Sequence, residues 1–277
     1  LVTVGSENDL AETFGKPDSN SSLSFLQAAS FLKYGNTLRV SRAVSEHNSP
    51  TVEAGDATFT ATVGVADGAP TSSQRQILVK NLTDFEGKTV NSALFALARC
   101  PGDLGNSLKI LIGRTSDSYH ASSSTFEDDG SHADHTRLMR ANFDAAPGSV
   151  STTGSNDEIH VLVVDQDGLI SGTKNNVLEK FQGLSLASDA KKDDGSSNYY
   201  FDVINNRSAF IYINKLGGLY TGADDTVANY DAGTATIANA SGSTNSPAGE
   251  SGDFQNGLFV ESFARGQDGV LNAASFT

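Results

Sequence analysis

The chain has 277 residues, 38% of them hydrophobic, and carries a formal net charge of −14 at pH 7. This length suffices for one large domain, or two small ones, with a sizeable buried core. The excess of carboxylates argues against direct nucleic-acid binding and against docking on an anionic membrane, because both need clustered lysine and arginine. No apolar run reaches the ~18 residues of a membrane-spanning helix, so we expect no membrane insertion.

The first residues predict the inside of a domain rather than a leader. Leu1–Val4 has no initiator methionine and no charged or apolar signal segment. We therefore expect the chain to be a fragment of a longer protein. A single cysteine, Cys100, leaves no internal disulfide, and its place before Pro101 predicts a small buried thiol without reactivity.

The first clear element is a helix that stops at a glycine. Ser21 or Ser22 is a candidate N-terminal cap, and Gly35-Asn36 is a candidate left-handed stop. Alternating apolar and polar residues then predict a half-buried strand over 38–44. The apolar residues that recur at helical spacing on one face are Phe25, Leu26, Ala28, Ala29 and Leu32.

Residues 46–92 differ in character from their surroundings. Thr58–Val63 and Gln76–Lys80 predict strands separated by turns rich in glycine, proline and serine. We interpret 46–92 as a small β-rich insertion.

The rest of the chain predicts mainly strands. The continuous apolar run over 159–164 is typical of a strand covered on both faces, and Asp165–Gly168 turns it back as a hairpin. Residues 217–257 are dominated by Gly, Ala, Ser, Thr and Asn, which predicts loop or irregular β-structure. Further strands are expected over 93–100, 108–112, 208–213 and 258–263, and a helix over 197–205 with Tyr199, Tyr200, Val203 and Ile204 inside. The fold class is therefore α+β, with a mixed, largely antiparallel sheet flanked by helices.

Two groups of side chains could bind a metal. Asp165-Gln-Asp167-Gly168 is similar to part of a calcium loop, but the later oxygen ligands and distal glutamate are missing, which favours an Asx-rich turn. His132, Asp134 and His135 follow three acidic residues, but their spacing matches no zinc pattern, which favours a polar surface loop.

Catalytic patterns are weak throughout. The chain has neither a G-x-S-x-G elbow nor a G-x-x-x-x-G-K-[ST] phosphate loop, and it has no tryptophan. A pair of carboxylates that meet only in space is not visible in a sequence. We predict a protein that is not an enzyme, with no catalytic, cofactor-binding or metal-binding residues.

Three stretches resemble contractile tail sheath proteins of long-tailed bacteriophages, in the order in which that family has them. The first combines Phe14-Gly-Lys-Pro17 with a helix ending Phe31-Leu-Lys-Tyr-Gly-Asn36 and the segment Leu38-Arg-Val-Ser-Arg-Ala-Val44. The second is Ala98-Arg-Cys-Pro-Gly-Asp-Leu-Gly-Asn-Ser-Leu-Lys-Ile110. The third runs from Glu158 to Asn205. The glycine-rich, lysine-poor composition suggests a giant phage of the phiKZ type.

The resemblance implies a structural role in a virion tail that is assembled in the cytoplasm of the host bacterium. Copies of the subunit would stack as rings around the tail tube and contract to drive the tube through the host envelope. Its partners would be other copies of itself, together with the tube protein and the baseplate through regions outside this chain. No counterpart of the family's tube-facing C-terminal region is expected before Thr277.

The resemblance also suggests a domain division. We expect residues 1–45 and 93–277 to form one discontinuous core domain, with the strands over 38–44 and 93–100 as near neighbours, and 46–92 to be an inserted domain. The second hypothesis for function is a surface-exposed β-rich adhesin or host-recognition module, suggested by the glycine-, serine- and threonine-rich loops. A third is a secreted hydrolase, which would need a large cleft with paired carboxylates.

Overall fold

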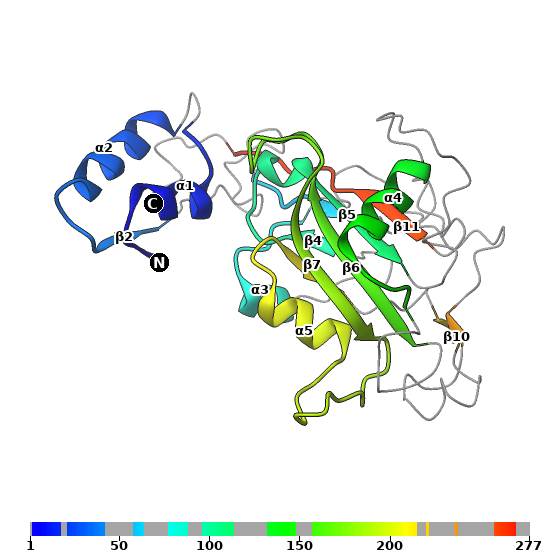
Figure 1. Cartoon of the computed structure of the whole chain (residues 1–277). Helices are drawn as coiled ribbons and strands as arrows, with labels where there is room; N and C mark the ends of the chain where they lie inside the picture. Colours follow the sequence, from blue (N-terminus) through cyan, green and yellow to red (C-terminus); the bar gives the residue numbers. More distant parts are fainter. Residues whose placement is uncertain are drawn as a thin grey trace.

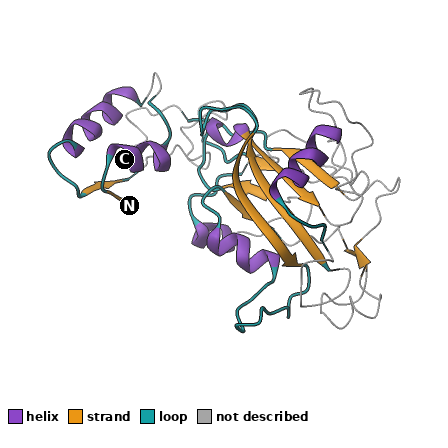
Figure 2. Ribbon diagram, in the orientation of Figure 1, coloured by secondary structure: helices purple, strands orange, loops and turns teal. Residues whose placement is uncertain are grey.

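The computed structural model describes residues 2–17, 21–41, 58–63, 77–87, 96–113, 132–147, 157–214, 220–221, 236–237 and 258–269. They form an N-terminal group and a larger body (Figure 1 and Figure 2). The predicted α+β class is confirmed, since helices accompany several sheets whose strands pair antiparallel. A separate antiparallel ribbon joins β9 (Tyr220–Thr221) to β10 (Thr236–Ile237).

The N-terminal group has its own small core. Strand β1 (Val2–Val4) pairs with β2 (Leu38–Val40), and helices α1 (Glu7–Phe14) and α2 (Ser22–Leu32) lie between them in the chain. Its fully buried residues are Val4, Leu10 and Ala29. The strand over 38–44 was expected beside the strand over 93–100, which is wrong: β2 pairs with β1 because their apolar residues close over α1 and α2.

The ends of the two helices differ from the prediction. Helix α1 was not predicted, yet Ser6 caps it by accepting a 3.1 Å hydrogen bond from the N–H of Asp9. Ser21 occupies the N-cap position of α2, but its side chain makes no capping hydrogen bond to the first turn of the helix. Gly35 is not in the left-handed region; a β-carbon there would lie 3.2 Å from the ring of Phe31, so a larger residue would need that ring to shift slightly.

The larger body is built on a four-stranded antiparallel sheet with the order β11-β5-β6-β7. The strands are β5 (Leu108–Gly113), β6 (Glu158–Asp165), β7 (Asn176–Ser185) and β11 (Leu258–Ser262). Every residue of β6 is buried, as predicted for a strand covered on both faces. Helix α4 (His132–Asn142) supplies Met139 to one side, and α5 (Tyr200–Arg207) supplies Tyr200 and Ile204 to the other.

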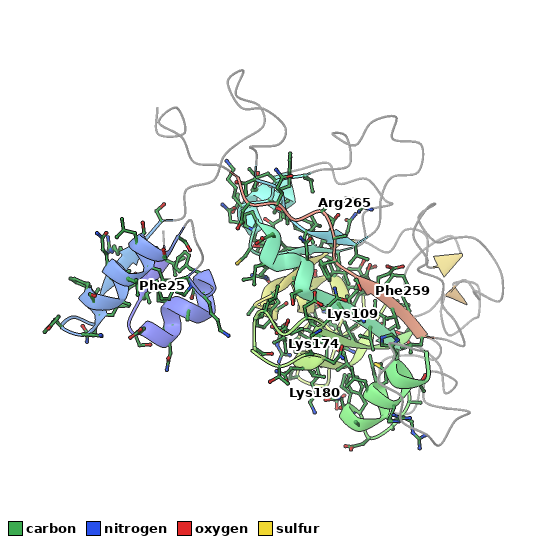
Figure 3. All side chains as sticks on the ribbon, turned by 90° about the horizontal axis from the view of Figure 1, so that it is seen from above. Phe25, Lys109, Lys174, Lys180, Phe259 and Arg265 are labelled. Carbon is green, nitrogen blue, oxygen red and sulfur yellow. The ribbon has the colours of Figure 1, made fainter. Side chains whose placement is uncertain are left out.

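A second sheet has the order β3-β4-β8, formed by β3 (Thr62–Val63), β4 (Ala96–Ala98) and β8 (Ile211–Ile213). The chain after β11 joins the two sheets, because Ala264 pairs with Thr62 and Gln267 pairs with Phe59. Arg265 lies in this connection, at φ 69°, and is labelled in Figure 3.

The described part of 46–92 contributes to this body. Ala61 and Val63 belong to the same buried cluster as Ile110 and Val161. Helix α3 (Leu82–Gly87), which was not predicted, places Phe85 against Tyr212 with ring centroids 5.1 Å apart and nearly parallel planes. Whether 46–92 is a separable domain stays a prediction, which a deletion can test.

Arg99 also lies over the Tyr212 ring. Its guanidinium carbon is 4.4 Å from the ring centroid, and its side chain donates to the carbonyls of Asn205 and Ile211. Burial raises the pKa of Tyr212, although the nearby Arg99 charge opposes the shift. The stack therefore ties α3, β4 and β8 together.

Candidate functional site

The turn at Asp165 begins the connection between β6 and β7. The return strand was predicted directly after Gly168, which is wrong: residues 169–175 continue the turn and β7 starts at Asn176. The carboxylate of Asp165 accepts hydrogen bonds from Ser107 Oγ (2.6 Å) and from the N–H groups of Gly168 (3.0 Å), Ile170 (3.0 Å) and Ser171 (2.6 Å). Ser171 Oγ donates a further bond of 2.8 Å. Donors point at both carboxylate oxygens, so the geometry is that of an Asx-type turn and not of a cation site.

These bonds also set the charge state of Asp165. Burial disfavours the ionised form, but the hydrogen bonds from Ser107, Ser171 and Ile170 outweigh it and lower the pKa of the carboxyl. Asp167, the second acid of the motif, is exposed. The turn is therefore a structural anchor that links the end of β6 to the start of β5 through Ser107.

The second metal candidate lies on a helix rather than in a surface loop. His132, Asp134 and His135 fall in α4, and the Nε2 atom of His135 lies 3.5 Å from Lys109 Nζ. The acidic residues 127–129 lie outside the described residues. In the part of the chain that the structure describes, no group of three or more His, Cys, Asp or Glu side chains is arranged to hold a metal ion.

Cys100 departs from its prediction. The thiol was expected to be buried but is exposed, and its Sγ lies 3.9 Å from the carbonyl oxygen of Thr13. The turn that follows brings Gly102 to φ 118°, as predicted for a glycine there. Cys100 therefore marks a contact between the C-terminal end of α1 and the larger body.

His160, which sequence reasoning did not single out, is buried in β6 and held on both ring nitrogens. Nδ1 accepts a 3.0 Å bond from the N–H of Gly183, and Nε2 lies 3.0 Å from the carbonyl oxygen of Ala145. Burial lowers the pKa of the imidazole, and the backbone hydrogen bonds oppose this only in part. Gly183, at φ 63°, lies in the register shift of β7 opposite His160, which places its N–H within reach of the ring. Because the pKa of His160 is lowered and Nδ1 accepts a hydrogen bond, the imidazole is neutral and makes a structural contact.

The outer face of α2 is the feature best suited to an intermolecular role. It consists of Leu23, Leu26 and Phe31 on the helix and Tyr34 just beyond its end, whose exposed fractions are 71%, 58%, 49% and 95%. Leu26 was expected on the inner face, which is wrong; the inner face holds Phe25, Ala29 and Leu32. The sequence could have indicated this exposed apolar face, because the helix is apolar on more than one side and contains no charged residue.

None of the described helices is long and apolar enough to cross a membrane. The absence of catalytic, cofactor-binding and metal-binding residues stays a prediction, as does the absence of enzyme activity.

The shallow depression lined by Lys80, Asn81, Leu82, Thr83 and Asp84 has a volume of about 570 Å³ and is widely open to solvent.

Comparison with known proteins supports a distant similarity to tail sheath proteins. No protein-family profile matches the chain. The chain is 28% identical over 177 residues to the tail sheath protein of Salmonella phage ViI. The aligned region spans 64% of this chain but only 22% of that relative, so the match covers about a fifth of the relative's length. The comparison gives no support to a phage of the phiKZ type.

Proposed function

We propose that this chain is part of a contractile tail sheath subunit, a structural protein of a bacteriophage virion. The observation that carries the proposal is the 28% identity over 177 residues to a tail sheath protein. The three resembling stretches are independent parts of the sequence, and they contribute α2 and β2, the 3-10 helix Asp103–Ser107 with β5, and β6 with β7 and α5.

In this role the subunit does mechanical work by exchanging one set of contacts between copies for another. Copies stack as rings around the tail tube and rearrange to a shorter, wider array on a trigger. Such a device needs rigid subunits and alternative interfaces rather than bond chemistry. The two-sided burial of β6 supports rigidity, because a strand covered on both faces resists distortion.

The similarity to a tail sheath protein also supports proposals about enzyme activity, partners and location. The subunit is not an enzyme, its partners are other copies of itself, and contacts with the tube and the baseplate lie in regions beyond this chain. It resides in the virion tail after assembly in the bacterial cytoplasm.

Negative-stain electron microscopy of the intact protein tests the proposal. We expect long tubular polymers with a regular axial repeat, and a shorter, wider form after acid or denaturant treatment. Discrete particles that bind bacterial cells would instead favour the adhesin. A hydrolase screen should show no turnover, and activity abolished by one Asp or Glu substitution would contradict the structural role.

A further inference from the structure

The outer face of α2 is an apolar surface that the described fold leaves uncovered. α2 packs on α1 and β2 through its inner face, where Phe25 and Ala29 lie (Figure 3). The four residues of the outer face are all at least 49% exposed, and Tyr34 is almost fully exposed. Isolated apolar residues on a surface are ordinary, but three on one helix, with a fourth just beyond its end, form a patch of the kind that marks an interaction site.

The described part of the larger body does not cover this face. The N-terminal group contacts that body at the end of α1, where Thr13 meets Cys100 and a β-carbon on Gly15 would lie 3.1 Å from Leu104. In the views of Figure 1 and Figure 3, α2 lies on the side of the N-terminal group away from the larger body. Among the described residues, none therefore covers the outer face of α2.

Charge identifies the kind of partner that this face suits. Each copy of the chain carries a net charge of −14, so two copies repel one another over most orientations. Residues Ser22–Leu32 contain no charged side chain, which makes α2 a place where two like-charged copies can approach with little repulsion. A strongly basic partner would instead be met by acidic side chains, and this face has none.

We propose that the outer face of α2 is a contact between neighbouring copies of this chain in the assembled polymer. This proposal rests on the sheath function proposed above and names one of its interfaces. A helix of eleven residues is about 16 Å long, so this contact is smaller than the ~800 Å² per partner of a stable interface. It is weak in an isolated pair and becomes effective when many contacts act together in a ring.

The first test is sedimentation of the 277-residue chain over a range of concentrations up to several hundred micromolar. We expect weak, reversible self-association that Leu26→Lys weakens about tenfold or more, since it removes a leucine that the contact would bury and adds a charge. Leu26→Met should retain association, and Gln182→Lys, which adds the same charge at an exposed position of β7, should leave it unchanged. Equal association of Leu26→Lys and the unsubstituted chain, including no association of either, would count against the proposal.

The second test separates this interface from the sheath function itself. In the intact protein, Leu26→Cys on a Cys100→Ser background is treated with a maleimide, and mass spectrometry locates the label. Reaction in the dispersed subunit with protection in tubes supports the proposal. If tubes form, reaction of the cysteine introduced at position 26 in both states, or its protection in both states, overturns the proposed α2 contact but leaves the sheath function standing. If the unsubstituted intact protein forms no tubes, the sheath function falls, and the sedimentation result decides whether α2 is a self-association surface.

Discussion

Ala61 lies so close to Gly105 that a β-carbon on Gly105 would come within 2.8 Å of the Ala61 methyl carbon. The same added carbon would lie 2.8 Å from the methyl carbon of Ala98. Gly105 belongs to the 3-10 helix after β4, whereas Ala61 lies just before β3 within the range 46–92. This three-way contact joins the proposed insertion to the centre of the larger body.

Gly105→Ala should therefore destabilise the chain by about 1–3 kcal/mol through overpacking. Chemical denaturation followed by circular dichroism would measure the change. Gly87→Ala is the matched control, because no described residue lies within 4 Å of an added β-carbon there and its φ is not in the left-handed region. A Gly105→Ala variant as stable as the control would show that this contact relaxes freely.

Deletion of 46–92 tests the domain division directly. The sequence-based division into a core and an inserted domain predicts a folded, cooperative protein after replacement of 46–92 by a short Gly/Ser bridge. The pairing of β3 with both β4 and Ala264 leads us to expect the opposite, a loss of cooperative unfolding. Thermal unfolding of the purified variant would show this as a broad transition or as aggregation. A sharp transition with a modestly lowered midpoint would establish 46–92 as a separable inserted domain.

Asp165→Asn should lower the free energy of unfolding by about 2–4 kcal/mol at neutral pH, since an amide cannot accept all the donors that face the carboxylate. The lowered pKa of Asp165 means that its contribution is present above about pH 3.8 and is lost as pH falls through the folded-state value. Asp167→Asn, at the exposed acid of the same turn, should change stability little. Equal effects of the two substitutions would contradict the anchoring role of Asp165.

The same turn should be independent of calcium. Its carboxylate already accepts protein hydrogen bonds, so EDTA should leave the melting temperature unchanged and added calcium should not raise it. Differential scanning fluorimetry at fixed ionic strength provides the measurement. A fall of several degrees in EDTA that calcium reverses would mean that a cation replaces these donors.

His160 should make the chain less stable in mild acid. Its pKa is lowered in the folded state, so the unfolded chain binds the additional proton below about pH 6.5. The contribution of neutral His160 is complete above that pH and declines at up to ~1.4 kcal/mol per pH unit below it. His160→Gln should flatten the dependence of unfolding free energy on pH between about 5 and 7. His135→Gln, on α4, serves as the comparison, and an unchanged slope in His160→Gln would assign the acid sensitivity elsewhere.

Much of the local structure could be read from the sequence, because it depends on neighbours along the chain. The apolar run of β6, the inner face of α5 and the turn at Asp165 each follow from residue type and spacing over a few positions. The short helices α1 and α3 could not, since eight and six residues carry too little periodic signal.

Strand partners and exposed faces were decided by tertiary structure. Spacing marks Leu38–Val40 as a strand, but does not distinguish pairing with Val2–Val4 from pairing with Ala96–Ala98. The apolar character of α2 likewise does not reveal which side packs inward. Both choices depend on packing between residues far apart in the chain, where shape and buried area select among arrangements that have the same local pattern.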